Sequence, residues 1–283
     1  MFHKTKTLVR AFKRANKSAF LEIKRLRLMA DAQAGFTEKL EFDAFPRPHF
    51  AYGIFFAALQ AKALGYYRIS VYEFGVGWGG GLLEMEKIAA MVTKETSVKV
   101  EVYGFDTGSG MPESVDYRDL PHVWKPGFFH LDAETLQKKL TTAKLVLGNV
   151  RETVKNFLAE ENPGPIGFVS IDVDYYSSTI DVLRLFDAHE RYLLPRVFCY
   201  LDDIIGDDWE IHCEYVGELL AVNDFNDRHE KRKICKINGF RFKRRIYAPW
   251  NEQMYVLHVF NHSLYCKYIN PKPEWDEYRF GAV

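Results

Sequence analysis

The chain has few cysteines: four in 283 residues, and none of them lies in a CxxC pair. Cysteines this scattered argue against a zinc site and against a dense disulfide framework, and they suit a reducing compartment. The sequence also lacks any run of about 18 apolar residues, which a membrane-spanning helix would need. Its N-terminus lacks the long apolar core of a secretory signal. We therefore expect a cytoplasmic protein without a transmembrane segment.

Net charge is absent as well, because 38 Lys and Arg residues balance 38 Asp and Glu residues. Nothing in the overall charge points to nucleic acid, and we expect no nucleic-acid partner. The basic residues are nevertheless concentrated in two segments, 1–29 and 228–245, each with nine Lys and Arg residues and one acidic residue. The run 228–245 is more typical of a solvated face, although an anionic acceptor or a membrane surface would also fit it.

The first basic segment has a helical pattern. Apolar residues recur in it at steps of three and four: Leu8, Phe12, Ala15, Ala19, Ile23 and Leu26. This spacing predicts an amphipathic basic helix over 8–27. We expect the helix to pack on the fold or between two copies in a homo-oligomer, because its apolar stripe is modest. Peripheral contact of residues 1–29 with an anionic membrane is the alternative.

Strand and helix patterns alternate after the break at Pro46-Arg47-Pro48. We predict strands over 69–74, 98–105, 144–147, 166–171 and 197–201, and helices over 50–64, 79–92, 131–140, 152–160 and 215–228. The segments 234–242 and 254–260 are predicted to form a closing antiparallel pair, and 107–131 a long loop or lid. Ser178, with Asp181 three residues later, is predicted to be the N-cap of the helix after the fourth strand.

This alternation predicts an α/β fold of the Rossmann-like, doubly wound type. We expect a mainly parallel sheet with an antiparallel closing strand, N-terminal helices and a lid. Along the chain, a helical cap is expected over 1–66, a ligand-binding domain over 67–270 and a C-terminal tail over 271–283. Ligands of such sheets bind at the carboxyl ends of the strands, where nearly every unusual residue of this sequence falls.

A glycine turn follows the first strand, since Gly75, Gly77 and Gly79 lie between it and the next helix. Glycine permits a tight turn there and lets the backbone approach a ligand closely. The spacing alone also fits a dinucleotide fingerprint or a plain strand–helix turn. Glu73, two residues before the first glycine, favours S-adenosylmethionine (SAM) over NAD. A carboxylate repels a diphosphate but attracts an ammonium and a sulfonium.

Asp106 ends the second strand, where an acidic side chain can accept hydrogen bonds from both ribose hydroxyls of a cofactor. SAM and NAD share that group, so Asp106 supports the fold without separating the two cofactors. The residues expected to bind the cofactor are Glu73, Gly75, Val76, Gly77, Gly79, Asp106 and Thr107.

Four aspartates follow two later strands. Asp172 and Asp174 come after the strand 166–171, and Asp202 and Asp203 end the strand 197–201. If these strands are neighbours, the carboxylates converge at one edge of the crevice, where their repulsion favours a bound cation. Ligands that are all oxygen select a hard ion such as Mg²⁺ over zinc. A hydroxyl beside such a cation loses its proton more easily, and a nearby carboxylate can accept it.

Together these motifs resemble the metal-dependent class I methyltransferases of the macrocin O-methyltransferase (TylF-like) family. The likeness covers roughly residues 67–240 and is carried by 73–77 (EFGVG), 103–107 (YGFDT), 110–113 (GMPE), 172–179 (DVDYYSST), 202–203 (DD) and 221–225 (AVNDF). Where the family usually has two glycines before the aspartate pair's strand, this chain has Leu194-Pro195-Arg196.

The resemblance implies methylation of a hydroxyl on a small molecule or sugar. It further implies Mg²⁺ held by Asp172, Asp202 and Asp203, with Asp174 near the acceptor as a candidate base. Which of Asp172 and Asp174 is ligand and which is base stays open, so both are candidate catalytic residues. Two rivals also stay open: an NAD(P)-dependent oxidoreductase on the same fold, and a non-catalytic methyltransferase-like module.

Overall fold

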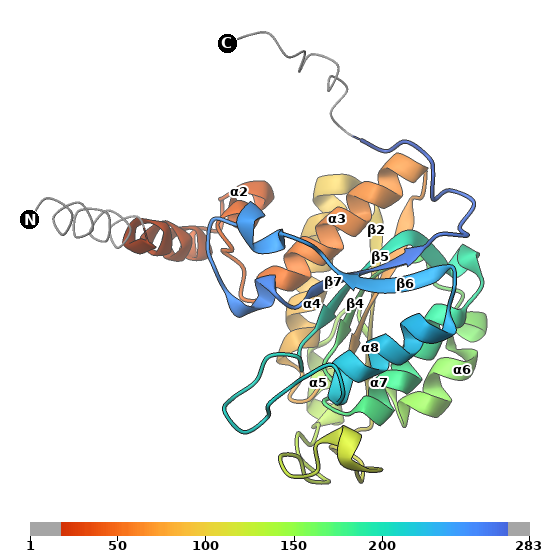
Figure 1. Cartoon of the computed structure of the whole chain (residues 1–283). Coiled ribbons are helices and arrows are strands. Elements are labelled where there is room, and N and C mark those ends of the chain that lie inside the picture. The colour runs from red at the N-terminus through yellow and green to blue at the C-terminus, as the bar shows by residue number, and fades with distance from the viewer. Residues whose placement is uncertain (1–17, 271–283) are drawn as a thin grey trace, which may run out of the picture.

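The computed structural model describes residues 18–270, and within them one mixed sheet of seven strands forms the centre (Figure 1). The strands are β1 (Arg68–Phe74), β2 (Lys99–Asp106), β3 (Lys144–Leu147), β4 (Ile166–Ile171), β5 (Leu193–Leu201), β6 (Arg232–Lys236) and β7 (Met254–Val259). They lie in the order β3-β2-β1-β4-β5-β7-β6, with β1 to β5 parallel and β7 antiparallel to both of its neighbours. The predicted Rossmann-like α/β fold is confirmed.

Helices cover both faces of the sheet. They are α2 (Phe36–Glu41), α3 (Pro48–Leu64), α4 (Gly80–Thr96), α5 (Ala133–Lys139), α6 (Val150–Glu161), α7 (Tyr176–Leu183) and α8 (Gly217–Arg228), with short 3₁₀ turns at 117–119, 184–187, 190–192, 240–243 and 249–251. α3 and α4 pack on one face, and α6, α7 and α8 on the other (Figure 1). This double cover leaves the carboxyl ends of the parallel strands as the open edge.

Side-chain alternation along β1 divides the core into two layers. Ile69 and Val71 pack in the layer beneath α3 and α4, whereas Tyr72 and Phe74 pack in the layer of α6 and α7. Glu73 continues the row of Ile69 and Val71 and is only 2% exposed. A carboxylate is therefore placed in a row whose other positions are apolar.

Two details of the predicted elements are wrong. α7 begins at Tyr176, its N-cap is Tyr175, and Ser178 lies inside the helix instead of capping it. The first turn is satisfied from elsewhere, because Asp119 accepts hydrogen bonds from the backbone N–H and the hydroxyl of Ser177. The strand predicted over 234–242 is shorter, since β6 ends at Lys236 and a 3₁₀ turn follows at 240–243.

A helix over 18–30 projects from the body of the molecule (Figure 1). Leu21 and Leu28 attach it by packing with Phe42 and Ala44. The residues of the predicted apolar stripe that lie within 18–270 do not take part in this packing.

Ile23 and Leu26, which belong to that stripe, are 51% and 53% exposed. The helix thus packs on the fold through Leu21 and Leu28 and not through the predicted stripe. Contact between copies or with a membrane stays a prediction. Leu8, Phe12 and Ala15 lie outside the described residues, as does the predicted tail 271–283. Over residues 18–270, no helix is both long and apolar enough to cross a bilayer.

The basic run 228–245 is mostly paired within the molecule instead of forming a free cationic face. Its partners are acidic side chains or carbonyls: Arg228 with Asp224, Lys231 with Glu230, Arg232 with Phe186, Lys233 with Asn226, Lys236 with Glu252, Arg244 with Asp43, and Arg245 with Glu41. The last two pairs attach the segment that follows β6 to the residues around α2. The run therefore contributes to the fold.

Candidate functional site

The glycine turn lies at the carboxyl end of β1 with all three glycines at positive φ: 81° at Gly75, 53° at Gly77 and 83° at Gly79. At Gly75 the constraint is also steric, because a Cβ atom there would lie 1.7 Å from the carbonyl oxygen of Asp172. A side chain at this position would therefore push apart the turn and the strand end that carries the aspartates. Gly79 is the N-cap of α4.

Asp106 holds this turn in place. Its Oδ2 accepts hydrogen bonds from the backbone N–H groups of Val76 and Gly77, each at 3.0 Å, and its Oδ1 accepts one from Gly108 at 2.7 Å. A carboxylate has about four acceptor positions, so one is left for a ligand. Thr107 follows and donates its hydroxyl hydrogen to the carbonyl of Gly110 at 2.7 Å.

Glu73 is the most unusual group beside the turn. Its Oε2 is buried and has no hydrogen-bond partner. Its other oxygen occupies space left by Gly81, where a Cβ atom would lie 1.8 Å from Oε1. Burial raises the pKa of Glu73 to about 8, against the opposing effect of Arg47. In the ligand-free protein Glu73 therefore keeps its proton below about pH 8, and a cationic ligand beside it would favour the ionised form.

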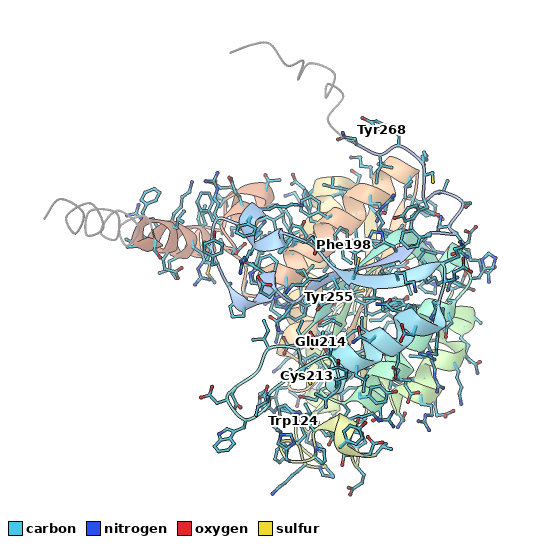
Figure 2. The ribbon with its side chains drawn as sticks, in the orientation of Figure 1. Trp124, Phe198, Cys213, Glu214, Tyr255 and Tyr268 are labelled. Carbon is cyan, nitrogen blue, oxygen red and sulfur yellow. The ribbon has the colours of Figure 1, made fainter. Side chains whose placement is uncertain are left out.

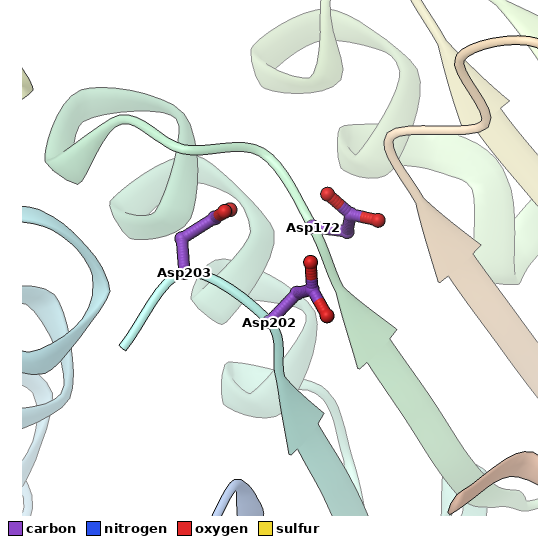
Figure 3. Close-up of side chains that lie close together, drawn as sticks. All are labelled: Asp172, Asp202 and Asp203. Atoms are coloured by element: carbon purple, nitrogen blue, oxygen red, sulfur yellow. The ribbon is translucent and has the colours of Figure 1, made fainter. Parts of the chain in front are cut away.

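Three aspartates converge at the ends of β4 and β5. These strands are parallel neighbours with Ile171 opposite Leu201, so the residues that follow them meet at one edge. One carboxylate oxygen from each of Asp172, Asp202 and Asp203 lies within 4.8 Å of the others (Figure 3). Burial, then Asp203 and Asp202, raise the pKa of Asp172 well above its ordinary value. The set offers a hard cation three oxygen ligands.

Asp174 lies beside this set without belonging to it. Its backbone has φ 58°, in the left-handed region, and its N–H donates to Oδ2 of Asp203 at 2.7 Å. Its side chain is buried, and burial followed by repulsion from Asp172 raises its pKa to about 8. Of the four predicted aspartates, three therefore share one candidate ion site and the fourth lies next to it.

A fifth carboxylate beside the four aspartates was not predicted from the sequence. Glu218, in the first turn of α8, is fully buried and accepts a hydrogen bond from the backbone N–H of Asp203 at 3.3 Å. Its pKa is raised, first by burial and then by Asp203. Helical periodicity in the sequence could have identified Glu218, because it lies on the same helical face as Ala221, Val222 and Phe225, which is otherwise apolar.

Glu73, Asp106 and the four aspartates line one cavity of about 740 Å³, whereas Gly79 and Glu218 lie outside its lining. Its walls are the glycine turn, the ends of β4 and β5, the segment 107–131 and the loop after Asp203. Trp124 and Phe129 line it from the segment 107–131, and Trp78 of the glycine turn lies 5.7 Å from Phe129, ring centre to ring centre. Figure 2 shows Trp124 at the same end of the molecule as Cys213 and Glu214. The volume falls in the usual range for cofactor and small-molecule pockets.

Sequence comparison finds no relatives, since no family model and no curated protein matches the chain. Structure comparison does find similar molecules. The calicheamicin methyltransferase CalS11 superposes with a TM-score of 0.52 at 19% identity, over 87% of this chain and 92% of that one. The O-methyltransferase NovP gives a TM-score of 0.52 at 13% identity, over 86% and 98%. At these identities the likeness establishes a shared fold, that of known methyltransferases.

Proposed function

We propose that this protein is a SAM-dependent O-methyltransferase that uses a divalent cation, with Mg²⁺ as the natural candidate. The single observation that carries the proposal is the composition of one cavity. It combines a glycine turn, the unpartnered buried carboxylate of Glu73, and three aspartate carboxylates within 4.8 Å of one another. The fold shared with methyltransferases supports it.

SAM fits the part of the cavity around the turn. Its ammonium would neutralise Glu73, whose Oε2 otherwise lacks a partner. The free acceptor position of Asp106 suits a ribose hydroxyl. Gly75, Val76 and Gly77 line the cavity, and the space around Gly77 is open, so a ligand could approach the backbone closely there. Gly79, also expected to bind the cofactor, lies behind them as the N-cap of α4. Thr107 lies next to Asp106 on the cavity wall.

A divalent cation fits the aspartate edge, with Asp172, Asp202 and Asp203 as its ligands. When bound, the cation would make loss of the acceptor hydroxyl's proton easier, and SAM would supply the methyl group. We assign acceptance of that proton to Asp174, which is buried on the wall of the same cavity. The chain's remaining task is to hold the acceptor oxygen and the methyl group in line, at ~3–3.5 Å.

The acceptor is a small molecule or sugar with a hydroxyl group in this proposal. The segment 107–131 would act as its lid, and the domain boundaries at 66/67 and 270/271 stay predictions. An NAD(P)-dependent oxidoreductase is disfavoured, because Glu73 and the aspartates would repel a diphosphate. A non-catalytic module is disfavoured because a decayed site would have lost some of these acids.

Thermal unfolding with SAM, S-adenosylhomocysteine or NAD tests the cofactor. We expect SAM and S-adenosylhomocysteine to raise the melting temperature of the wild-type protein and NAD to leave it unchanged. Gly77→Asp should abolish the shift, because it adds a carboxylate at φ 53° in the cavity. Gly65→Asp is the matched control: φ is 92° there, the surroundings are open and the position is outside the cavity. Stabilisation by NAD alone would reverse the assignment.

Manganese binding, followed by electron paramagnetic resonance, tests the ion site. Asp202→Asn and Asp203→Asn should each weaken Mn²⁺ binding strongly while SAM still raises the melting temperature. Asp208→Asn, an exposed acid on the following loop, is the control and should change neither. Unchanged Mn²⁺ affinity in both site variants, or full methyl transfer in EDTA, would remove the cation from the proposal.

A further inference from the structure

The segment Pro46-Arg47-Pro48 has a structural role that the proposed function leaves unexplained. Pro48 is the first residue of α3 and Arg47 is its N-cap. The two prolines restrict φ on either side of Arg47, so the backbone at this residue is held in one direction. Its side chain lines the same cavity as Glu73 and Asp172. A restrained backbone therefore carries one arginine at the wall of an acidic pocket.

Arg47 is one of two basic residues among those that line the cavity, and the other is Arg151. Arg151 already donates from Nε to Asp181 at 3.1 Å. Within residues 18–270, the guanidinium of Arg47 has neither a hydrogen bond nor an ion pair, and it lies 5.3 Å from the ring centre of Phe50. Its five N–H donors are thus free for a ligand.

The position of Arg47 relative to the acids narrows the choice of ligand. The positive charge of Arg47 lowers the pKa of both Glu73 and Asp172, although burial outweighs it at each. All three residues line the same cavity, so the guanidinium is close enough to both the cofactor end and the aspartate edge for its charge to act on each. A free donor set beside a free acceptor suits a ligand that carries both charges on adjacent groups, as an amino acid does.

We propose that Arg47 binds the α-carboxylate of the methionine moiety of SAM while Glu73 binds the α-ammonium. This inference rests on the proposed function, because it assigns one more contact of the same cofactor. It makes Arg47 a binding residue for the amino-acid end of SAM. The two prolines would favour this contact, because they restrict the backbone that carries the donor and so reduce the conformational freedom lost on binding.

The test compares two ligands that differ only in the carboxylate: S-adenosylhomocysteine and its decarboxylated analogue. Their affinities are measured by isothermal titration calorimetry on the full chain. The wild-type protein should prefer S-adenosylhomocysteine, and Arg47→Met should weaken it about 10- to 100-fold while leaving the analogue unchanged. Arg47→Lys should recover part of the preference, because it keeps the charge and loses the planar pair of donors. Arg151→Met is the matched control, and any effect it has should be equal for both ligands.

Other results of the titrations would overturn the inference or the proposed function. Equal weakening of both ligands by Arg47→Met overturns the inference, because the arginine then acts only on the shape or charge of the pocket. No effect on either ligand overturns it as well. If Arg47→Met does not fold, equal affinity of the wild-type protein for the two ligands still refutes the inference. If the wild-type protein binds neither ligand, the proposed function itself fails.

Discussion

Glu73→Gln separates the cost of a buried charge from the shape of the side chain that carries it. Glutamine has nearly the same size as glutamate, so the substitution preserves the packing beneath α4 and removes the ionisable group. Glu73 is 2% exposed and its Oε2 has no partner. Most of the cost of ionising it in the folded protein is therefore the loss of water around the charge.

The sign and size of the effect follow from the pKa of Glu73, which burial raises from 4.5 to about 8. Between these values the unfolded chain has lost the proton and the folded chain keeps it, so the stability of the wild-type protein falls as the pH rises. Each pH unit corresponds to about 1.4 kcal/mol, which amounts to at most about 5 kcal/mol across the interval. This contribution is fully present below pH 4.5 and is lost at pH 8.

Urea unfolding of the wild-type and Glu73→Gln proteins at pH 5, 6.5 and 8, without SAM or metal, measures the difference directly. We expect the free energy of unfolding of the variant, relative to that of the wild type, to rise by up to about 1.4 kcal/mol for each pH unit. The buried amide adds a constant difference that does not depend on pH. SAM should stabilise the variant much less than the wild type, because the amide cannot neutralise an ammonium. Parallel pH profiles for the two proteins would refute the reasoning, since Glu73 would then be ionised or solvated in the folded state.

Two further comparisons use neighbouring residues as matched controls. Gly81→Ala should weaken SAM binding and lower the melting temperature, because its Cβ would collide with Glu73. Gly80→Ala meets no atom within 4 Å and should change neither. Equal effects of the two variants in thermal-shift titrations would contradict the claim that Glu73 occupies the space beside Gly81. Arg244→Met should cost about 3–5 kcal/mol of unfolding free energy, because it leaves Asp43 buried without its partner. The exposed pair broken by Arg245→Met should cost about 0–1 kcal/mol, and chemical denaturation that found similar losses would refute the distinction.

The positions of the strands and the open edge could be predicted from sequence because both depend on local patterns. Runs rich in apolar residues marked β1, β4 and β5, and glycine or aspartate marked the point where each ends. The meeting of Asp172 with Asp202 and Asp203 followed from those runs once β4 and β5 were taken as neighbours. That inference succeeded because parallel strands of this fold class all end at one edge.

The wrong predictions concern residues whose partner is distant in sequence. Ser178 had the local pattern of an N-cap, but Asp119 supplies the acceptor from 58 residues upstream. Arg244 was counted in a solvated run, yet its partner Asp43 is 201 residues away. Glu218 could have been found from helical periodicity alone. Nothing in the sequence near Arg47 says which cavity it lines, because that depends on how α3 packs against the sheet.

Asp119 connects the segment 107–131 to the aspartate edge. It is fully buried and accepts from the backbone N–H of Val115 at 2.7 Å as well as from Ser177. The middle of the segment is thereby tied to the start of α7, which follows Asp172 and Asp174 in the chain. Residues on both sides of Asp119 line the cavity, among them Met111 before it and Trp124 after it, and backbone hydrogen bonds join Met111 to Gly127 and Phe128. A change at Asp119 should therefore disturb the aspartate edge itself, whereas a change at Trp124 should affect only access to it.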